Sequence, residues 1–252
     1  MDPLLLGDLT VQVRDLLRFH QRVGIINYPQ KEHLQTLFLS CSQNDVGRGR
    51  RQATATSSQK SRNPQFSMVG IRKDIAQCEQ CMPKVHRLGQ VFGRGPDHPR
   101  LMVVGDLPRP AEGIAPDEVI FGTEEDNMLR RMMAAIKLSM DEVYVCNVVK
   151  CVAVDGQPDK ECARRCFFHL KREIAALRPA FILAMGEQAS GLLTGSSAPL
   201  VRLRGRFYAY SGVGGSPVRI MPTFHPRFLL QHVEMKQMVW QDLQMLQRQL
   251  NR

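Results

Sequence analysis

The sequence lacks any apolar run that approaches the roughly 20 residues needed to span a bilayer. Its first residues, Met1 to Asp8, also lack the basic start and the long apolar segment of a secretion signal. The seven cysteines are odd in number and include pairs spaced like metal-binding knuckles, which fits a reducing compartment better than a disulfide framework. We therefore expect a cytoplasmic protein that does not enter a membrane.

Acidic residues are also scarce, with 24 Asp and Glu against 34 Lys and Arg and a formal net charge of +10. Residues 42–65 are small, polar and basic, and Asp45 is the single acid among them. This composition predicts a disordered basic linker, which could act as a solvated tether or dock on phosphates. The excess of positive charge indicates a polyanionic partner.

The cysteines suggest a metal site. Thiolates in separated pairs can hold an iron-sulfur cluster or a zinc ion, because both need four soft anionic ligands. Cys162-Ala-Arg-Arg-Cys166 could act as a zinc knuckle that leaves Cys151 free, so spacing alone decides neither the metal nor the ligand set. The first candidate set consists of two separated pairs: Cys78 with Cys81, and Cys151 with Cys166.

Short apolar runs alternate with helical patterns after Cys81, which predicts an α/β fold. We expect a three-layer α/β/α sandwich around a central four-stranded parallel sheet. The expected strands are residues 101–105, 143–149, 181–186 and 218–223, and the expected helices are residues 127–137, 160–177, 187–193 and 236–250. An amphipathic pattern over residues 3–22 adds an N-terminal helix. The resulting organisation is a helical extension (1–41), a linker (42–65) and an α/β domain (66–252).

The predicted strands end in residues suited to a binding site. In open α/β sheets, ligands bind outside the carboxyl ends of the strands. Three of these ends carry polar or special residues: Gly105-Asp106, Asn147 and His225-Pro226. We expect these ends to form the functional site together.

A series of motifs runs from about Cys78 to the C-terminus: Cys78-x-x-Cys81, Leu101-Met-Val-Val-Gly105, Phe121, Val143-Tyr-Val-Cys-Asn-Val-Val-Lys-Cys151, Cys166-Phe-Phe-His-Leu170, Leu203-Arg-Gly205 and Thr223-Phe-His-Pro226. In this order the motifs resemble those of the iron-sulfur uracil-DNA glycosylases usually called family 4. The resemblance implies a DNA-repair hydrolase that excises uracil from single- or double-stranded DNA and leaves an abasic site. We expect the protein to be a monomer.

The resemblance also implies residue roles. Uracil would stack on Phe121 beside Gly105, while the amide of Asn147 pairs with its O4 and N3–H. His225 would donate a hydrogen bond to the charge that develops on uracil O2. Asp106 or Glu112 would orient the attacking water or stabilise the sugar cation. The resemblance assigns a [4Fe-4S] cluster to Cys78, Cys81, Cys151 and Cys166, and the basic residues expected to contact DNA phosphates are Arg204, Arg206 and Arg227.

Two segments depart from the usual family pattern. The family's Gly-Glu-Ala-Pro-Gly is here Gly105-Asp-Leu-Pro-Arg-Pro110, so Asp106 replaces a longer Glu and Arg109 replaces a Gly. A usual Gly-Arg-Ala-Gly is here Gly122-Thr-Glu-Glu-Asp-Asn127, whose acids would either face the DNA or complement the dipole of the next helix. Two alternatives follow: a catalytically weakened iron-sulfur DNA-binding homologue, and a glycosylase with a shifted preference among deaminated bases.

Overall fold

The computed structural model describes residues 67–81, 86–109, 119–153, 160–212 and 217–251, which lie within one unit, Lys60–Arg252. The predicted N-terminal helix, the basic linker and Glu112 fall outside these residues. No helix in the described part of the chain is long and apolar enough to cross a membrane.

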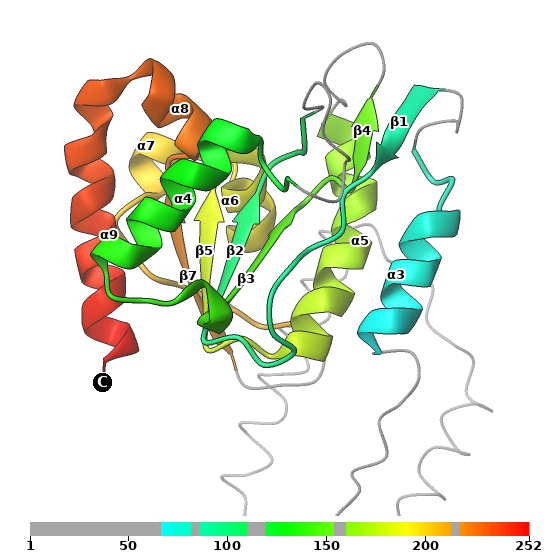
Figure 1. The fold of residues 1–252 in the computed structure, drawn as a ribbon, viewed down its shortest axis with the longest axis horizontal. Helices are drawn as coiled ribbons and strands as arrows, with labels where there is room; N and C mark the ends of the chain where they lie inside the picture. Colours follow the sequence, from blue (N-terminus) through cyan, green and yellow to red (C-terminus); the bar gives the residue numbers. More distant parts are fainter. Residues whose placement is uncertain (1–66, 82–85, 110–118, 154–159, 213–216, 252) are drawn as a thin grey trace, which may run out of the picture. The chain divides into compact units, whose positions relative to one another are not determined.

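A central sheet of five strands has the order β3-β2-β5-β7-β6 (Figure 1). Strands β3, β2, β5 and β7 are mutually parallel, which confirms the predicted parallel sheet. Strand β6 pairs antiparallel with β7 and was not predicted, because three residues are too few to show a periodicity. The bounds are β2 Leu101–Gly105, β3 Val143–Asn147, β5 Phe181–Met185, β6 Tyr208–Tyr210 and β7 Val218–Thr223.

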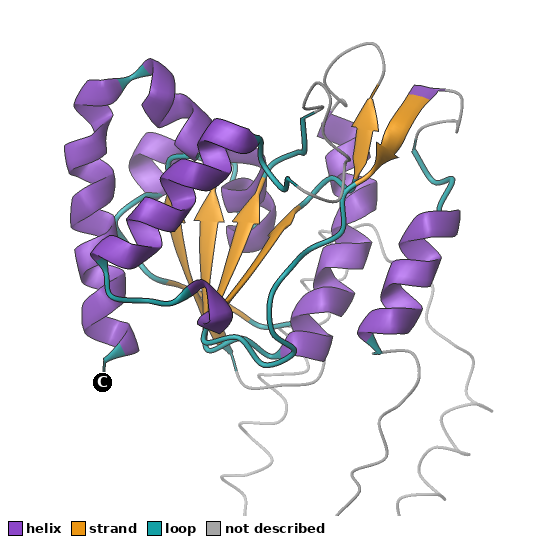
Figure 2. Ribbon diagram, in the orientation of Figure 1, coloured by secondary structure: helices purple, strands orange, loops and turns teal. Residues whose placement is uncertain are grey.

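Helices cover both faces of this sheet (Figure 2). All five residues of β2 are buried, and since side chains alternate across a strand, they enter two different cores. Leu101 and Val103 pack with residues of α4 (Thr123–Ala135), α8 (Pro226–Gln231) and α9 (Lys236–Leu250). Met102 and Val104 pack with residues of α5 (Lys160–Leu177) and α6 (Glu187–Thr194). The α/β/α layering predicted from the sequence is therefore confirmed.

The four helices predicted in this domain agree closely with observed helices, whereas the helices at Met68–Gln77, Leu200–Leu203 and Pro226–Gln231 were not predicted. Helix α5 and helix α9 have the predicted bounds. Helix α4 begins at Thr123 and not at Asn127, because three acids in its first turn stabilise the positive N-terminal end of the helix dipole. The bounds are α3 Met68–Gln77, α4 Thr123–Ala135, α5 Lys160–Leu177, α6 Glu187–Thr194, α7 Leu200–Leu203, α8 Pro226–Gln231 and α9 Lys236–Leu250, with short 3-10 turns at Met140–Glu142 and Val233–Met235.

A second, two-stranded sheet brings the cysteine segments together. Strand β1 (Arg87–Gln90) pairs antiparallel with β4 (Cys151–Ala153), and Gln90 is the register partner of Cys151. The Gln90 side chain donates a hydrogen bond to the Ile75 carbonyl of α3 at 2.7 Å, and Arg87 donates one to the Cys78 carbonyl at 2.6 Å. The end of α3, where Cys78 lies, is thereby held beside the strand that begins at Cys151.

Candidate functional site

Gly105 and Asn147 end two neighbouring parallel strands and are register partners. A Cβ atom at Gly105 would overlap the ring of Phe121 and stand 2.7 Å from Oδ1 of Asn147. Only glycine therefore leaves room for the aromatic ring and the amide to approach each other here. The structure brings Gly105, Phe121 and Asn147 together at the carboxyl end of the sheet.

The amide of Asn147 is only half satisfied. Its side chain is buried, and Nδ2 donates a hydrogen bond to the Ile120 carbonyl at 2.7 Å. Oδ1 is buried as well and has no hydrogen-bond partner within the described residues. A buried acceptor without a partner costs about 1–3 kcal/mol. The amide oxygen is therefore ready to accept a hydrogen bond from a ligand.

His225 contacts the ring of Phe121. Its ring lies 4.6 Å from that of Phe121, between centroids. Nδ1 accepts the backbone N–H of Arg227 at 3.2 Å, so in the neutral ring the proton is on Nε2, which is buried and has no partner in the described part of the chain. Burial, together with the charges of Arg227 and Arg109, lowers the pKa of His225 to about 3. His225 is therefore a neutral hydrogen-bond donor.

Asp106 follows Gly105 and binds the start of helix α6. Its Oδ1 accepts the backbone N–H of Ala189 at 2.8 Å, and the amides of Glu187 and Gln188 also donate to this carboxylate. Burial raises the pKa of Asp106 to about 6 in spite of these hydrogen bonds. Asp106 and His225 line one cavity of about 440 Å³, together with Arg227, which places three of the sequence-predicted residues around one space.

Two of the three acids after Phe121 have internal roles. Asp126 accepts the backbone N–H groups of Ile120 at 2.8 Å and Phe121 at 3.0 Å, so it fixes the segment that carries the aromatic ring. Glu125 accepts a hydrogen bond from Nε of Arg227 at 3.2 Å. The prediction missed both roles. The sequence indicates these roles only through the position of the acids, which follow shortly after the predicted stacking residue Phe121.

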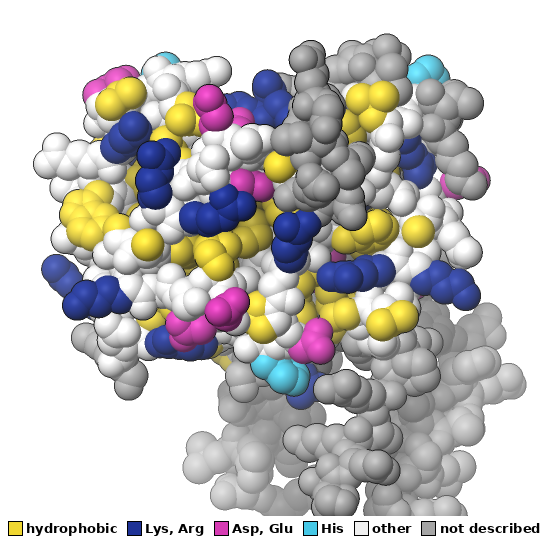
Figure 3. All heavy atoms as spheres, in the orientation of Figure 1, with side chains coloured by type: hydrophobic (Ala, Val, Ile, Leu, Met, Phe, Trp, Pro, Cys, Tyr) yellow, Lys and Arg dark blue, Asp and Glu magenta, His cyan; other side chains and the backbone are white. Residues whose placement is uncertain are grey.

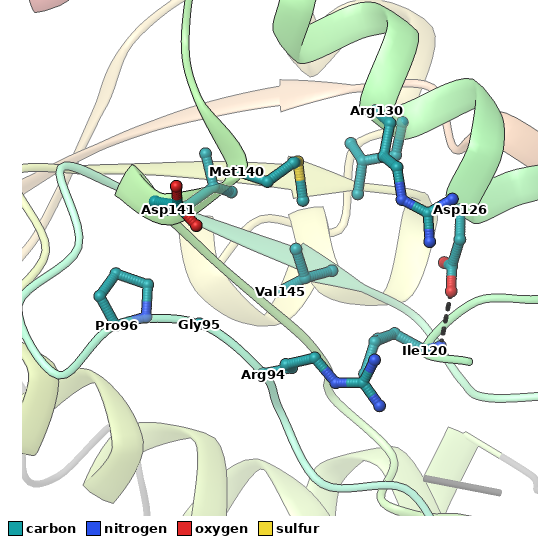
Figure 4. Close-up of a pocket in the computed structure, with 11 residues that line it drawn as sticks. Arg94, Gly95, Pro96, Ile120, Asp126, Arg130, Met140, Asp141 and Val145 are labelled. Atoms are coloured by element: carbon teal, nitrogen blue, oxygen red, sulfur yellow. Dashed lines mark hydrogen bonds between the residues drawn. The ribbon is translucent and has the colours of Figure 1, made fainter. Parts of the chain in front are cut away.

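A larger cavity, of about 550 Å³, lies between α4, β3 and residues 94–96. Arg94 and Arg130 reach toward it from opposite walls, and Asp126 borders it while bonded to Ile120 (Figure 4). Neither Asn147 nor His225 lines it. Size alone therefore does not identify the functional site: Asp106 and His225 line the smaller cavity, whereas Asn147 and Phe121 line neither cavity.

The predicted phosphate-binding arginines have different surroundings. Arg204 forms two hydrogen bonds with Asp242, at 2.7 and 3.1 Å, and Asp242 also accepts the hydroxyl of Thr223 at 2.7 Å. Arg206 is exposed. Figure 3 shows Lys and Arg side chains spread over this face of the molecule and not gathered in one patch.

The two predicted cysteine pairs line a single small cavity, together with Lys150 and His169. Cys162 does not line it. Burial raises the pKa of the Cys166 thiol to about 12 and also raises the pKa of the Cys151 thiol. The thiolate forms of these cysteines therefore need a nearby cation.

Within the ranges that the structure describes, no group of three or more His, Cys, Asp or Glu side chains is arranged to hold a metal ion. The four thiols border one space but do not converge on one ion position. The neighbouring Lys150 forms an ion pair with Glu173 at 2.5 Å, and both side chains are fully buried. The sequence analysis did not predict this ion pair. The sequence offered one indication of it: Lys150 is a charged residue that directly follows the apolar Val148 and Val149.

The fold is a mostly parallel sheet covered on both faces, and its site joins an aromatic ring, an amide and a neutral imidazole at the strand ends. This arrangement is suited to binding a flat, polar ring. Residues 92–244 match the sequence profile of the uracil DNA glycosylase superfamily, and the chain belongs to this superfamily.

Three relatives cover most of the domain. The Type-4 uracil-DNA glycosylase of Saccharolobus solfataricus is 23% identical over 186 residues, which are 72% of this chain and 85% of the relative. The protein of the same name from Thermotoga maritima is 26% identical over 189 residues, 69% of this chain and 90% of the relative. That from Archaeoglobus fulgidus is 24% identical over 176 residues, 68% of this chain and 87% of the relative.

Proposed function

We propose that this protein is a uracil-DNA glycosylase that hydrolyses the N-glycosidic bond of uracil in DNA and leaves an abasic site. Membership of the superfamily and the names of the relatives support this function. The observation that carries it is a pair of buried polar atoms without partners in the described structure, Oδ1 of Asn147 and Nε2 of His225, both on residues close to Phe121.

These atoms match uracil in donor and acceptor character. With the base stacked on Phe121, its N3–H donates to Oδ1 of Asn147, and the second N–H of the same amide donates to O4. Cytosine has no N3–H and carries an amino group at C4. Its N3 acceptor would therefore face the amide oxygen of Asn147, and its amino donor would face the amide N–H. In a buried pocket, such a mismatch leaves polar atoms unpaired and gives strong discrimination.

Bond cleavage places negative charge on the departing base and positive charge on the deoxyribose. The Nε2–H of His225 donates to uracil O2, where that negative charge develops, and the ring needs no reorganisation because it is already neutral and buried. The Asp106 carboxylate stabilises the sugar cation and orients the water whose oxygen bonds to C1′. The bond between C1′ and N1 breaks, and the base leaves with the bonding electron pair. The water loses a proton as its oxygen bonds to C1′, which balances the proton that the uracil anion takes up to become free uracil.

Binding requires the base to leave the duplex stack, at a cost of a few kcal/mol that is smaller in single-stranded DNA. We propose that Arg206 and Arg227 contact the phosphates that flank the flipped nucleotide. Arg206 is exposed, and Arg227 lines the cavity with His225, where its ion pair with Glu125 at 3.2 Å must open before it contacts a phosphate. The pairing of Arg204 with Asp242 supports a structural role for Arg204 in place of the expected phosphate contact.

We further propose that Cys78, Cys81, Cys151 and Cys166 hold a [4Fe-4S] cluster. Their convergence on one cavity supports this ligand set over the alternative that uses Cys162. A zinc ion with Zn–S bonds of about 2.3 Å would need all four sulfurs around one point, whereas a cluster binds each thiolate at a separate iron. When bound, the cluster tethers α3, β4 and α5 to one another and supplies the cation that buried thiolates require.

One observation favours a second candidate, a DNA-binding homologue with weakened catalysis. The Asp106 carboxylate is hydrogen-bonded to the amides that begin α6, which limits its freedom to orient water. Arg109, beside His225, is a further departure from the family motif. This candidate predicts DNA binding without base release.

A strand-cleavage assay separates these functions. Cluster-loaded protein is incubated with labelled single- and double-stranded oligonucleotides that contain uracil, hypoxanthine or xanthine, and alkali then breaks any abasic sites. Cleavage at uracil that is lost in Asn147→Ala supports the proposal. Cleavage only at another base indicates a shifted preference, and retained DNA binding with intact strands supports the second candidate.

A further inference from the structure

The cavity lined by the four cysteines also contains a histidine without an assigned role. His169 lies on α5, one turn after Cys166, and its side chain lines this cavity. It is only 4% exposed, and neither ring nitrogen has a hydrogen-bond partner within the described residues. Buried polar atoms almost always have partners, so these two nitrogens indicate a group that completes the cavity.

Within the described residues, neither ring nitrogen of His169 finds an acceptor among the protein groups around it. The ring of Phe168 meets the imidazole edge-on at 5.6 Å between centroids. The nearby charges of Lys150 and Arg172 are cations, which only donate hydrogen bonds. Asp74, the acid whose charge acts on His169, is paired with Arg172 at 2.7 Å. An acceptor for the imidazole N–H must therefore come from what fills the cavity.

We propose that one N–H of His169 donates a hydrogen bond to a sulfur atom of the iron-sulfur cluster, either an inorganic sulfide or a cysteine thiolate. This inference rests on the proposed [4Fe-4S] cofactor. Hydrogen bonds to the sulfurs of a cluster raise its reduction potential, because they stabilise the more negative reduced form. Groups that hydrogen-bond to metal ligands also help to retain the metal.

His169 acts here as a positioning residue and not as a fifth ligand. Four cysteines already line the cavity, and four thiolates complete the coordination of a [4Fe-4S] cluster. Either tautomer of a neutral imidazole has one N–H donor, so no particular tautomer is required. The role is therefore separate from catalysis and has its own spectroscopic readout.

The test uses the purified holoprotein and three variants. His169→Leu removes the donor, His169→Gln keeps a donor, and Arg164→Leu alters an exposed position of the same helix as a control. The measurements are iron content, the midpoint potential from voltammetry, and the pulsed EPR coupling of exchangeable protons to the reduced cluster. We expect His169→Leu to lower the potential, to lose one proton coupling and to release iron to a chelator about 10-fold faster.

The same reasoning predicts that His169→Gln restores much of the potential and that Arg164→Leu behaves as wild type. A His169→Leu protein with the wild-type potential and the wild-type proton coupling overturns the proposal. A structural role alone would alter iron retention and leave both of those spectroscopic quantities unchanged.

Wild-type protein labelled with ¹⁵N-histidine decides the question even if His169→Leu does not accumulate. A weak nitrogen coupling supports the hydrogen bond, whereas the strong coupling of a directly bound nitrogen, or no coupling, overturns it. Iron-free wild-type protein would contradict the proposed cofactor itself. Iron-loaded protein without the histidine coupling leaves the cofactor in place and overturns only the role of His169.

Discussion

Removal of the hydrogen-bond donor of His225 is expected to slow base release without weakening DNA binding. Nε2 is buried, has no partner in the described structure and belongs to a ring whose pKa is lowered to about 3, so it donates as a neutral group. Loss of one such preorganised donor typically reduces the rate of the chemical step by about 10²–10³, or about 2.7–4 kcal/mol. We expect a reduction of this size in the single-turnover rate.

The variant chosen at His225 must separate its role as a hydrogen-bond donor from two structural roles. His225 also caps α8 through Nδ1 and packs against Phe121. Alanine at this position removes the cap as well, at a cost of about 1 kcal/mol of stability. His225→Asn keeps a capping acceptor but is too short to replace the donor. It should therefore lose the catalytic step while it retains more of the melting temperature than His225→Ala.

Uracil release under single-turnover conditions gives the rate, and fluorescence anisotropy with undamaged DNA gives the affinity. A His225→Asn rate within a factor of about 3 of wild type, or about 0.7 kcal/mol, would refute the proposed role. An equal loss in rate and in DNA affinity would place the residue in binding instead.

Three further predictions concern the same site. The rate of uracil release should fall about tenfold per pH unit below a pKa of about 6, because the Asp106 carboxylate is the active form and burial raises its pKa to that value; Asp106→Asn should abolish this dependence, and a profile with no acid limb would contradict it. Asn147→Ala should abolish discrimination between uracil and cytosine and, because it leaves the Ile120 carbonyl without its donor, should lower the free energy of unfolding by about 1–3 kcal/mol in urea denaturation. Glu125→Gln should free Arg227 for phosphate and lower the Kd for DNA about fivefold in anisotropy titrations at low salt; an unchanged Kd would show that the ion pair does not compete with DNA.

The sequence predicted those elements whose pattern is local and long enough to read. Helix α5 and helix α9 keep their predicted bounds because their apolar residues recur at helical spacing over many turns. Strands β1, β4 and β6 were missed because each has only three or four residues. Helix α3 was missed as well, and only two of its residues are buried.

The candidate site was predictable only as a set of residues at strand ends. Gly105, Asn147 and His225 were expected to meet because parallel strands bring their carboxyl ends to one edge, and the structure places them together. Their partners come from distant parts of the chain: Asp106 binds the amide of Ala189, and Arg204 binds Asp242. No spacing rule links such residues, since only the folded chain determines these pairs.

Quantification of the free base tests the central claim most directly. Iron-loaded protein is incubated with an oligonucleotide that contains one uracil, and chromatography measures uracil in solution against abasic sites in the DNA. The proposed function predicts one free uracil for each abasic site, and a strong reduction of both in Asn147→Ala and His225→Asn. DNA that binds the protein but retains all of its uracil would contradict it.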